Sequence, residues 1–451
     1  MSFNDINFIF LFLPVFLLIY YGLPSFCRNT VLLLGSIAFF LVGGFKNPVI
    51  LILPVAEIIL AYLLALGMDA KRRLALPLLI VYLAGAFGVL LGFKYAGLFT
   101  GESIVLPAGI SFYTFQLTGY MMDVYRQNMP PEKSLLNFSA GMLMFPKLLS
   151  GPIVPWKDLK PQLENRTLTA KKFDNGLRTF IIGLALKTLV ADRIGGLWSQ
   201  LGTIGYDSIS TPLAWLGILA YSLQLFFDFY GYSVMAIGIG RMLGFELPEN
   251  FLFPYASKSM SDFWRRWHVT LGAWFRDYVY IPLGGSRKGQ KALVINLFVV
   301  WVMTGVWHGS TLNFLIWSMF IFGLIVAEKL SGGRFPGKNP VLTRIYMIFA
   351  IMISWMFFAI TDLSDIGVYL GRLFPITGKF AGAFAGDFVF YLKQFGVYIA
   401  IGIALCLPWT KKVWLRLRST PIFTAILFIL FWLSIYCVSG GMNDPFMYFS
   451  F

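Results

Sequence analysis

The side chains best suited to catalysis are two histidines, His268 and His308, which are the only histidines in the 451-residue sequence. Imidazole has an ordinary pKa near neutrality, so it can take up and return a proton at physiological pH. His308 ends an apolar run and is followed by Gly309 and Ser310, which can leave space beside the ring. A histidine in apolar surroundings can equally be structural and bind a neighbouring helix. Composition alone leaves both interpretations open.

The segment before and after His268 concentrates charge and aromatic rings in a chain that is otherwise poor in charge. It contains Asp262, Trp264, Arg265, Arg266, Arg276 and Asp277. An interfacial helix would place Trp at the headgroup level and Arg against phosphates. The same residues could instead brace a polar cavity through ion pairs. Arginine also offers charge-assisted hydrogen bonds to phosphate, so the three arginines are candidates for binding a phosphorylated ligand.

Other kinds of chemistry have little support. Two histidines separated by 40 positions make a weak zinc site, since catalytic zinc has three protein ligands as a rule. Carboxylates in or beside apolar runs have no ligand spacing, and we predict no metal: Glu57, Asp123, Asp228, Asp262 and Asp277. There is no G-x-S-x-G elbow and no phosphate-binding loop of the Walker type. The three cysteines are far apart in the sequence and predict no disulfide framework.

The elements that must position these residues are membrane spans. The sequence is 58% hydrophobic and 13% charged, whereas soluble domains carry about 25% charged residues. A span needs about 20 mostly apolar residues. Ten runs satisfy this: Ile6–Leu23, Thr30–Phe45, Val49–Gly67, Leu74–Phe93, Pro212–Gly231, Ala292–His308, Leu312–Ala327, Leu342–Ile360, Phe388–Leu407 and Pro421–Val438.

Four further stretches mix aromatic, Gly, Pro and charged residues: Leu106–Tyr125, Leu135–Ile153, Phe173–Val190 and Phe263–Tyr280. They can be tilted spans, re-entrant helices or interfacial helices. Irregular backbone at membrane depth persists only where protein buries it or where it lines a cavity. We therefore predict an all-α polytopic membrane protein, a bundle with about 10–13 spans plus re-entrant or interfacial helices around an internal chamber.

The charge distribution predicts the topology. The net charge is +15, and the basic residues fall in short clusters between apolar runs, such as Lys71–Arg73, Arg287–Lys291 and Lys411–Arg418. Such clusters mark cytoplasmic loops, and this explanation is favoured over nucleic-acid binding. The N-terminus and the C-terminus are then both outside. Ala292–His308 runs outward and Leu312–Ala327 returns, so we expect His308 in the outer half of the membrane.

The chain is expected to be a single integral membrane domain, residues 1–451, with N-terminal spans in 1–95, a core in 106–330 and C-terminal spans in 342–451. No internal repeat or linker interrupts it. The moderately polar stretch Thr361–Asp387 is the longest candidate external loop and could dock a partner.

Several blocks together resemble the membrane-bound O-acyltransferase (MBOAT) family. They follow one another along most of the chain: Ile110–Gln116, Asp123–Arg126, Phe145–Leu148, Gly151–Ile153, Phe227–Ser233, Pro248–Phe251, Asp262–His268, Arg276–Gly285 and Trp307–Gly309. Blocks this long in this order are more specific than any one motif. The Ile281–Gly285 stretch and the Pro445–Phe449 tail resemble the bacterial polysaccharide O-acetylation branch, which includes alginate and peptidoglycan O-acetylation proteins.

The sequence departs from that branch at three positions. Tyr230 and Val234 stand where the branch commonly has Ser and Asp, and Lys147 replaces a His that commonly follows Phe-Pro. These changes can alter the donor or acceptor preference.

The resemblance implies that His308 is the principal catalytic residue and that His268 is a second functional position. It implies that the helices surround a central tunnel. It implies a cytoplasmic acyl donor, acetyl-CoA, with Arg265, Arg266, Arg276 and Trp264 as candidates for holding the coenzyme, and no permanently bound cofactor. It also implies transfer to an extracytoplasmic polysaccharide, often through a separate extracytoplasmic acetyltransferase or acceptor protein, in the bacterial cytoplasmic membrane.

Two other functions fit parts of the pattern. The teichoic-acid D-alanylation proteins share the Asp262–His268 and Trp307–Gly309 blocks, so the donor can be D-alanine on a carrier protein. A flippase or transporter for a polysaccharide or lipid precursor would also have many spans, intramembrane charges and a cavity. Transport would require neither an acyl donor nor His308.

Overall fold

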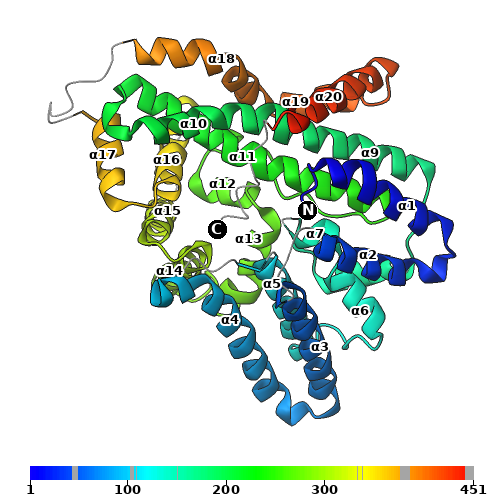
Figure 1. The fold of residues 1–451 in the computed structure, drawn as a ribbon. Helices are drawn as coiled ribbons and strands as arrows, with labels where there is room; N and C mark the ends of the chain where they lie inside the picture. Colours follow the sequence, from blue (N-terminus) through cyan, green and yellow to red (C-terminus); the bar gives the residue numbers. More distant parts are fainter. Residues whose placement is uncertain are drawn as a thin grey trace. The chain divides into compact units, whose positions relative to one another are not determined.

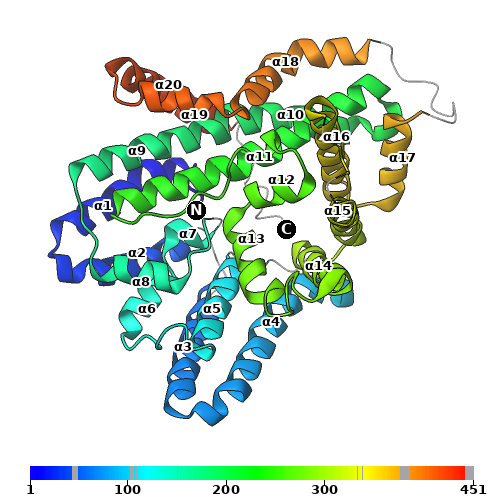
Figure 2. The same cartoon turned by 180° about the vertical axis from the view of Figure 1, so that it is seen from behind.

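The computed structural model describes residues 1–42, 49–101, 106–107, 109–149, 151–332, 334–337, 339–375 and 386–441. Within these ranges the regular elements are helices (Figures 1 and 2). They group into two compact units, one formed by residues 1–183 and 232–249 and the other by residues 184–231 and 250–451. The Pro445–Phe449 tail and the middle of Thr361–Asp387 lie outside the described residues.

Nine helices in the described part of the chain are long and apolar enough to cross a membrane. They coincide with nine of the ten predicted runs and are α2 (Arg28–Val42, counted with the turn before it), α3 (Val49–Ala70), α4 (Ala75–Thr100), α11 (Thr211–Met242), α14 (Gly289–His308), α15 (Leu312–Leu330), α16 (Pro340–Ala359), α18 (Asp387–Leu405) and α20 (Pro421–Ser439). The tenth run forms a π-helical turn, Phe8–Phe12, and the shorter α1, Leu13–Gly22. The prediction of an all-α polytopic protein is confirmed.

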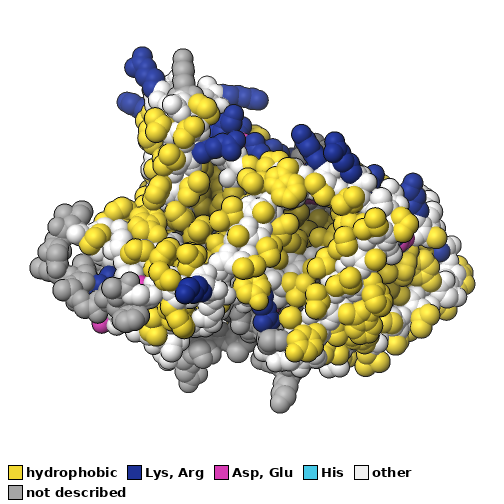
Figure 3. Space-filling view, turned by 90° about the horizontal axis from the view of Figure 1, so that it is seen from above, with side chains coloured by type: hydrophobic (Ala, Val, Ile, Leu, Met, Phe, Trp, Pro, Cys, Tyr) yellow, Lys and Arg dark blue, Asp and Glu magenta, His cyan; other side chains and the backbone are white. Residues whose placement is uncertain are grey.

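The outer surface of these helices is apolar, as lipid requires. Leu18 is 74% exposed, Ile422 is 71% exposed and Phe428 is 65% exposed. Figure 3 shows hydrophobic side chains over most of the visible described surface, with Lys and Arg in groups. Water would penalise so much exposed apolar area, whereas acyl chains do not.

The first unit contains α1 to α4, α5 (Ile110–Tyr125), α6 (Leu135–Met142), α7 (Phe145–Leu148), α8 (Trp156–Glu164), α9 (Ala170–Ala185) and the end of α11. In sequence, α5 was ambiguous between span and interface. Fourteen of its sixteen residues are buried, so it is a core helix of this unit. Close contact between α9 and α11 requires glycine, because a Cβ on Gly176 would come within 2.7 Å of the Gly238 carbonyl oxygen.

The second unit contains both histidines. Its helices are α10 (Asp192–Ile204), the first part of α11, α12 (Met260–Arg266), α13 (Val269–Phe275), α14 to α16, α17 (Leu363–Leu373), α18, α19 (Trp409–Leu417) and α20. The ambiguous stretch Phe263–Tyr280 is thus two short helices and a π-helical turn, Arg276–Tyr280. Helix α15 packs between α14 and α16 and also contacts α12.

One buried charge cluster in this unit joins α11 to the chain before α10. The Lys187 ammonium lies 2.6 Å from Asp192 and 2.6 Å from Asp228. All three side chains are at most 2% exposed. Two carboxylates around one ammonium satisfy the requirement that buried charge be paired. The cluster holds α11, which carries Phe229 beside His268.

Candidate active site

His308 is the last residue of α14, and its ring is enclosed by aromatic side chains. The imidazole lies 4.8 Å from the Trp317 ring, 5.2 Å from Phe358 and 6.2 Å from Phe314, between ring centroids. Trp307 lies beside it at 4.4 Å. His308 itself is 6% exposed. Because α14 has 20 residues, its rise separates His308 from Gly289, next to the basic residues Arg287 and Lys288, by about 30 Å.

The turn after His308 depends on small residues. A Cβ on Gly309 would lie 2.3 Å from a ring carbon of Phe314, and a Cβ on Gly305 would lie 2.4 Å from the Ser318 hydroxyl. Real Cβ atoms do not make such contacts, so α14 and α15 can approach only with glycine at these positions. This approach brings Phe314 and Trp317 of α15 against His308.

Two polar side chains of α15 fix it against α16 at the same level. The Asn313 amide nitrogen donates to the carbonyls of Phe357 and Phe358 at 3.1 and 3.2 Å, and the Trp317 indole N–H donates to the Ser354 hydroxyl at 3.1 Å. The Asn313 contacts use carbonyls at the end of α16, which lack intrahelical partners. The sequence analysis did not identify Asn313 or Trp317, although an amide within an apolar run is a usable signal.

An aromatic cluster extends from His308 to the segment that precedes His268. We define it as Trp264, Trp267, Trp301, Trp317, Trp355 and Phe358. Trp264 lies 5.7 Å from Trp317, 5.1 Å from Trp301 and 6.0 Å from Trp355, while Trp267 lies 4.9 Å from Trp355. Trp317 therefore contacts both His308 and Trp264, the residue that the sequence predicted to bind the coenzyme.

His268 is buried at the start of α13 in a left-handed backbone conformation, with φ 44° and ψ 55°. Few residues other than glycine adopt this conformation, and it is concentrated at functional sites. Its Nδ1 lies 3.3 Å from the Asn250 side-chain oxygen, and its ring packs edge-on to Phe229 at 4.8 Å. Burial lowers the pKa of His268 to about 3. The ring is therefore neutral at physiological pH.

The three predicted phosphate-binding arginines lie in different settings. Arg265 is exposed and its Nε donates to the Ser261 carbonyl of its own helix at 3.1 Å. Arg266 pairs with Asp262 at 3.1 Å. Arg276 is exposed and forms two hydrogen bonds to the neighbouring Asp277 at 2.7 and 2.9 Å. A carboxylate partner already neutralises Arg276, so Arg265 offers the more available charge.

Glu328 connects α15, the helix that contacts His308, to α12, the helix that carries Trp264. Its carboxylate accepts from the backbone N–H groups of Met260 and Ser261 at 2.6 and 3.0 Å and from the Ser261 hydroxyl at 2.9 Å. Tyr346 of α16 donates to it at 3.3 Å. A carboxylate at a helix N-terminus satisfies unpaired N–H groups and interacts favourably with the helix dipole. Glu328 thus fixes α12, which carries Trp264, and the sequence analysis did not identify it.

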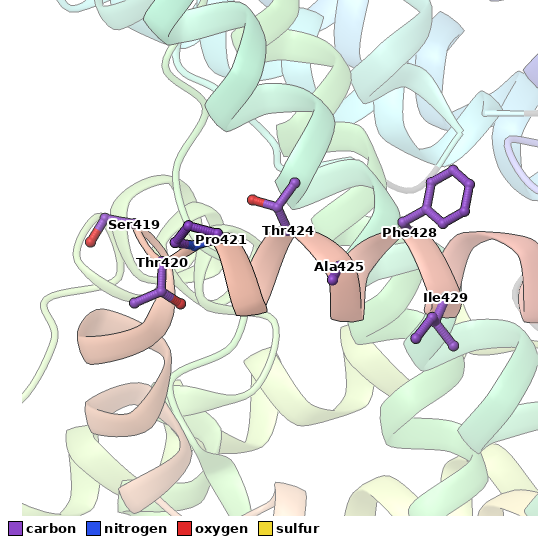
Figure 4. A pocket seen from close by; sticks show the side chains of 7 residues that line it. All are labelled: Ser419, Thr420, Pro421, Thr424, Ala425, Phe428 and Ile429. Atoms are coloured by element: carbon purple, nitrogen blue, oxygen red, sulfur yellow. The ribbon is translucent and has the colours of Figure 1, made fainter.

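One open hollow among the described residues is unrelated to these groups. It has a volume of about 750 Å³ and is lined by Ser419, Thr420, Pro421, Thr424, Ala425, Phe428 and Ile429 (Figure 4). All seven belong to α20 or the two residues before it. They are apolar or carry a hydroxyl, and none is a base. The hollow is a surface groove of a lipid-facing helix.

Two of the sequence departures lie in apolar surroundings. Tyr230 stacks on Phe226 with ring centroids 5.3 Å apart, within the second unit. Lys147 of α7, in the first unit, is 2% exposed, and burial lowers the pKa of its amine well below the ordinary value. Among the described residues no three His, Cys, Asp or Glu side chains lie close enough to hold a metal ion.

The structure is that of a helical membrane protein in which the His308 imidazole is enclosed by aromatic rings at the end of a helix long enough to span the membrane. The sequence matches the model of the membrane-bound O-acyltransferase family over residues 132–363. The chain belongs to this family and is an O-acyltransferase.

Relatives in two branches of the family are similar to this chain. It is 37% identical over 382 residues to the "Probable alginate O-acetylase AlgI" of Pseudomonas fluorescens, covering 83% of this chain and 76% of the relative. It is 33% identical over 420 residues to the "Peptidoglycan O-acetyltransferase" of Helicobacter pylori, covering 80% and 78%. The "Teichoic acid D-alanyltransferase" of Bacillus subtilis is 30% identical over 231 residues, covering 49% and 58%.

Proposed function

We propose that this protein is a membrane O-acetyltransferase that takes an acetyl group from cytoplasmic acetyl-CoA and delivers it across the membrane for O-acetylation of an extracytoplasmic polysaccharide. Delivery passes through an extracytoplasmic partner protein. The protein resides in the bacterial cytoplasmic membrane with both termini outside. The alginate and peptidoglycan O-acetylation relatives support the acetyl group and the polysaccharide, because they match about four-fifths of the chain.

The observation that carries the proposal is the position of His308. It lies about 30 Å along α14 from the basic loop at Arg287 and Lys288. Basic loops remain cytoplasmic, so His308 belongs near the opposite face. A donor that enters beside α12 would meet the aromatic cluster first and His308 at its far end. That order suits a transfer that begins on one side of the membrane and ends on the other.

The reaction needs a base and a place for the thioester. His308 removes the proton from the acceptor hydroxyl as its oxygen attacks the thioester carbonyl carbon. A tetrahedral intermediate forms, the carbon–sulfur bond then breaks, and the thiolate takes the proton back from the imidazolium. The products are the acetate ester and free coenzyme A. The carbonyl groups at the C-terminal end of α14 stabilise the transient imidazolium, because this end of a helix carries partial negative charge.

The other residues have supporting roles. Arg265 holds phosphates of the coenzyme at the α12 surface. Arg266 and Arg276 contribute less, because Asp262 and Asp277 already pair with them. Trp264 packs against the acyl-carrying arm where the arm enters the aromatic cluster. His268 positions the thioester or relays a proton in its neutral form. No metal is involved.

The direct experiment measures turnover of labelled acetyl-CoA by purified wild type and by His308→Ala. We expect wild-type turnover and a loss of at least about 100-fold in the variant, since general base catalysis is worth about that much. Equal thermal unfolding midpoints would show that the fold survives. Unchanged turnover in the variant would reject His308 as the base.

D-alanyl transfer is the second candidate, favoured by the similarity to the Bacillus subtilis protein over about half of this chain. It predicts no turnover of acetyl-CoA and His308-dependent turnover of a D-alanyl thioester on a carrier protein. A transporter would turn over neither donor, and a His308 substitution would leave its transport unchanged.

A further inference from the structure

Asn250 is buried directly against His268. It is 1% exposed and lies in the connection after α11, whereas His268 is 4% exposed at the start of α13. The two segments run beside each other: the Val269 N–H donates to the Asn250 carbonyl and the Leu252 N–H donates to the Arg266 carbonyl, both at 2.9 Å. This pairing holds the left-handed backbone of His268, so the direction of its ring is set by the main chain.

The Asn250 side-chain oxygen contacts a hydroxyl and an imidazole nitrogen. The Thr270 hydroxyl donates to it at 2.7 Å, and Nδ1 of His268 lies 3.3 Å from it. An amide oxygen can only accept hydrogen bonds. A contact between this oxygen and Nδ1 therefore requires a proton on Nδ1. In a neutral imidazole the lone pair is then on Nε2.

We propose that Asn250 is a positioning residue that holds His268 as the Nδ1–H tautomer, so that Nε2 presents its lone pair to the reacting groups. An imidazole in this state can accept a proton or a hydrogen bond through Nε2 and cannot donate one there. Burial lowers the pKa of the ring to about 3 and so keeps it neutral. The tautomer follows from this orientation of the Asn250 amide, and only its kinetic consequence rests on the proposed acyl transfer.

The opposite orientation of the Asn250 amide makes a different prediction. Its nitrogen would then donate to Nδ1 of His268, and the ring proton would be on Nε2. The two tautomers have distinct nitrogen chemical shifts. Because the chain has two histidines, a sample of the full chain labelled with ¹⁵N-histidine gives two imidazole spin systems. A His308→Gln sample assigns the one that belongs to His268.

The experiment compares wild type, Asn250→Asp, Asn250→Ala and Thr270→Val in detergent or nanodiscs. We expect the Nδ1–H tautomer in wild type, retention of this tautomer in Asn250→Asp and a mixture of tautomers in Asn250→Ala. Thr270→Val removes only the hydroxyl that donates to the Asn250 oxygen and leaves the contact between this oxygen and Nδ1 of His268. We therefore expect it to keep the wild-type tautomer. An Nε2–H signal in wild type, or a change of tautomer in Asn250→Asp, would overturn the proposal.

Kinetics provide the second readout. Misplacing a ring proton can be costly, and we expect Asn250→Ala to lower kcat by about tenfold or more with little change in KM. Thr270→Val should stay near the wild-type kcat. If Thr270→Val lost as much activity as Asn250→Ala, the effect would be structural and the positioning role would be rejected. If no variant or wild type turned over any acyl donor, the proposed function would fail while the tautomer result stood by itself.

Discussion

Trp264 of α12 and Trp317 of α15 meet edge to face, with ring centroids 5.7 Å apart and ring planes at 73°. Trp317 meets His308 in the same manner at 4.8 Å and 84°. One indole therefore touches both the proposed base and the helix that leads to His268. Edge-to-face pairs of aromatic rings add about 0.5–1.5 kcal/mol beyond the burial of their area. The site is held by ring packing more than by charge.

Replacing Trp317 should separate packing from hydrogen bonding. Trp317→Leu removes both ring contacts, so we expect a large loss of kcat and a lower unfolding midpoint. Trp317→Phe keeps a ring and loses the bond to Ser354, and should retain more activity. Trp215→Phe is the matched control, since Trp215 donates a similar bond to the Leu373 carbonyl. A loss of kcat in Trp215→Phe as large as in Trp317→Phe would contradict this expectation.

The glycine after His308 should be intolerant of even a methyl group. Gly309→Ala would push the Phe314 ring, which stacks on His308, and overpacking typically costs about 1–3 kcal/mol. We expect lower activity and lower thermal stability. Gly323→Ala, on the same helix as Phe314, is the control, because no atom lies within 4 Å of the added carbon. Equal behaviour of the two variants in activity and unfolding assays would refute the steric argument.

Loss of the Glu328 carboxylate should release α12. Glu328→Ala leaves two backbone N–H groups without their acceptor, and hydrogen bonds to charged groups contribute about 1.5–3 kcal/mol each. Glu328→Gln keeps one acceptor oxygen and should be less damaging. We expect the unfolding midpoint to fall in the order wild type, Gln, Ala, with KM for the acyl donor rising in the same order. Lys329→Ala, the adjacent residue, should behave like wild type.

Arg265 and Arg276 should differ in their effect on donor binding. Losing one charge-assisted hydrogen bond to phosphate costs about 1.5–3 kcal/mol, or roughly tenfold or more in KM. We expect that effect for Arg265→Ala and a smaller one for Arg276→Ala, whose guanidinium is already held by Asp277. KM for acetyl-CoA measures both. A larger effect at Arg276 would contradict this and would indicate that the coenzyme binds at the π-helical turn Arg276–Tyr280 instead of at α12.

The neutral state of His268 has a consequence for stability below neutral pH. Its pKa is about 3 in the folded chain and 6.5 ordinarily. Between these values the unfolded chain binds the extra proton, so the free energy of unfolding falls as the pH drops below about 6.5. At pH 5 the loss reaches about 2 kcal/mol. Thermal unfolding of wild type and His268→Gln from pH 8 to pH 5 tests this, and a gap that stays constant would contradict it.

The membrane spans could be predicted because an apolar run of this length can cross the bilayer as a helix, which satisfies its own backbone hydrogen bonds. The end of α14 at His308 was visible too, since Gly309 and Ser310 stop the apolar run. The stretch Phe263–Tyr280 could not be resolved. A left-handed residue at His268 divides it into two short helices, and neither is long enough to show a helical period.

The supporting residues of the site required the tertiary structure. Asn250 precedes His268 by 18 positions, and Glu328 follows Ser261 by 67. The members of each pair lie on different elements, so no local pattern relates them. The roles of both histidines remain predictions that the proposed experiments address.

Helix α15 sets the distance between His308, which Trp317 contacts, and the start of α12, which Glu328 binds. Trp317 and Glu328 are eleven positions apart, which is close to three helical turns, so both side chains leave the same face about 16 Å from each other. An insertion of one residue between them would rotate one of the two groups by about 100°. Loops elsewhere in the chain can change length at little cost, but this helix cannot lose or gain a residue without uncoupling α12 from His308.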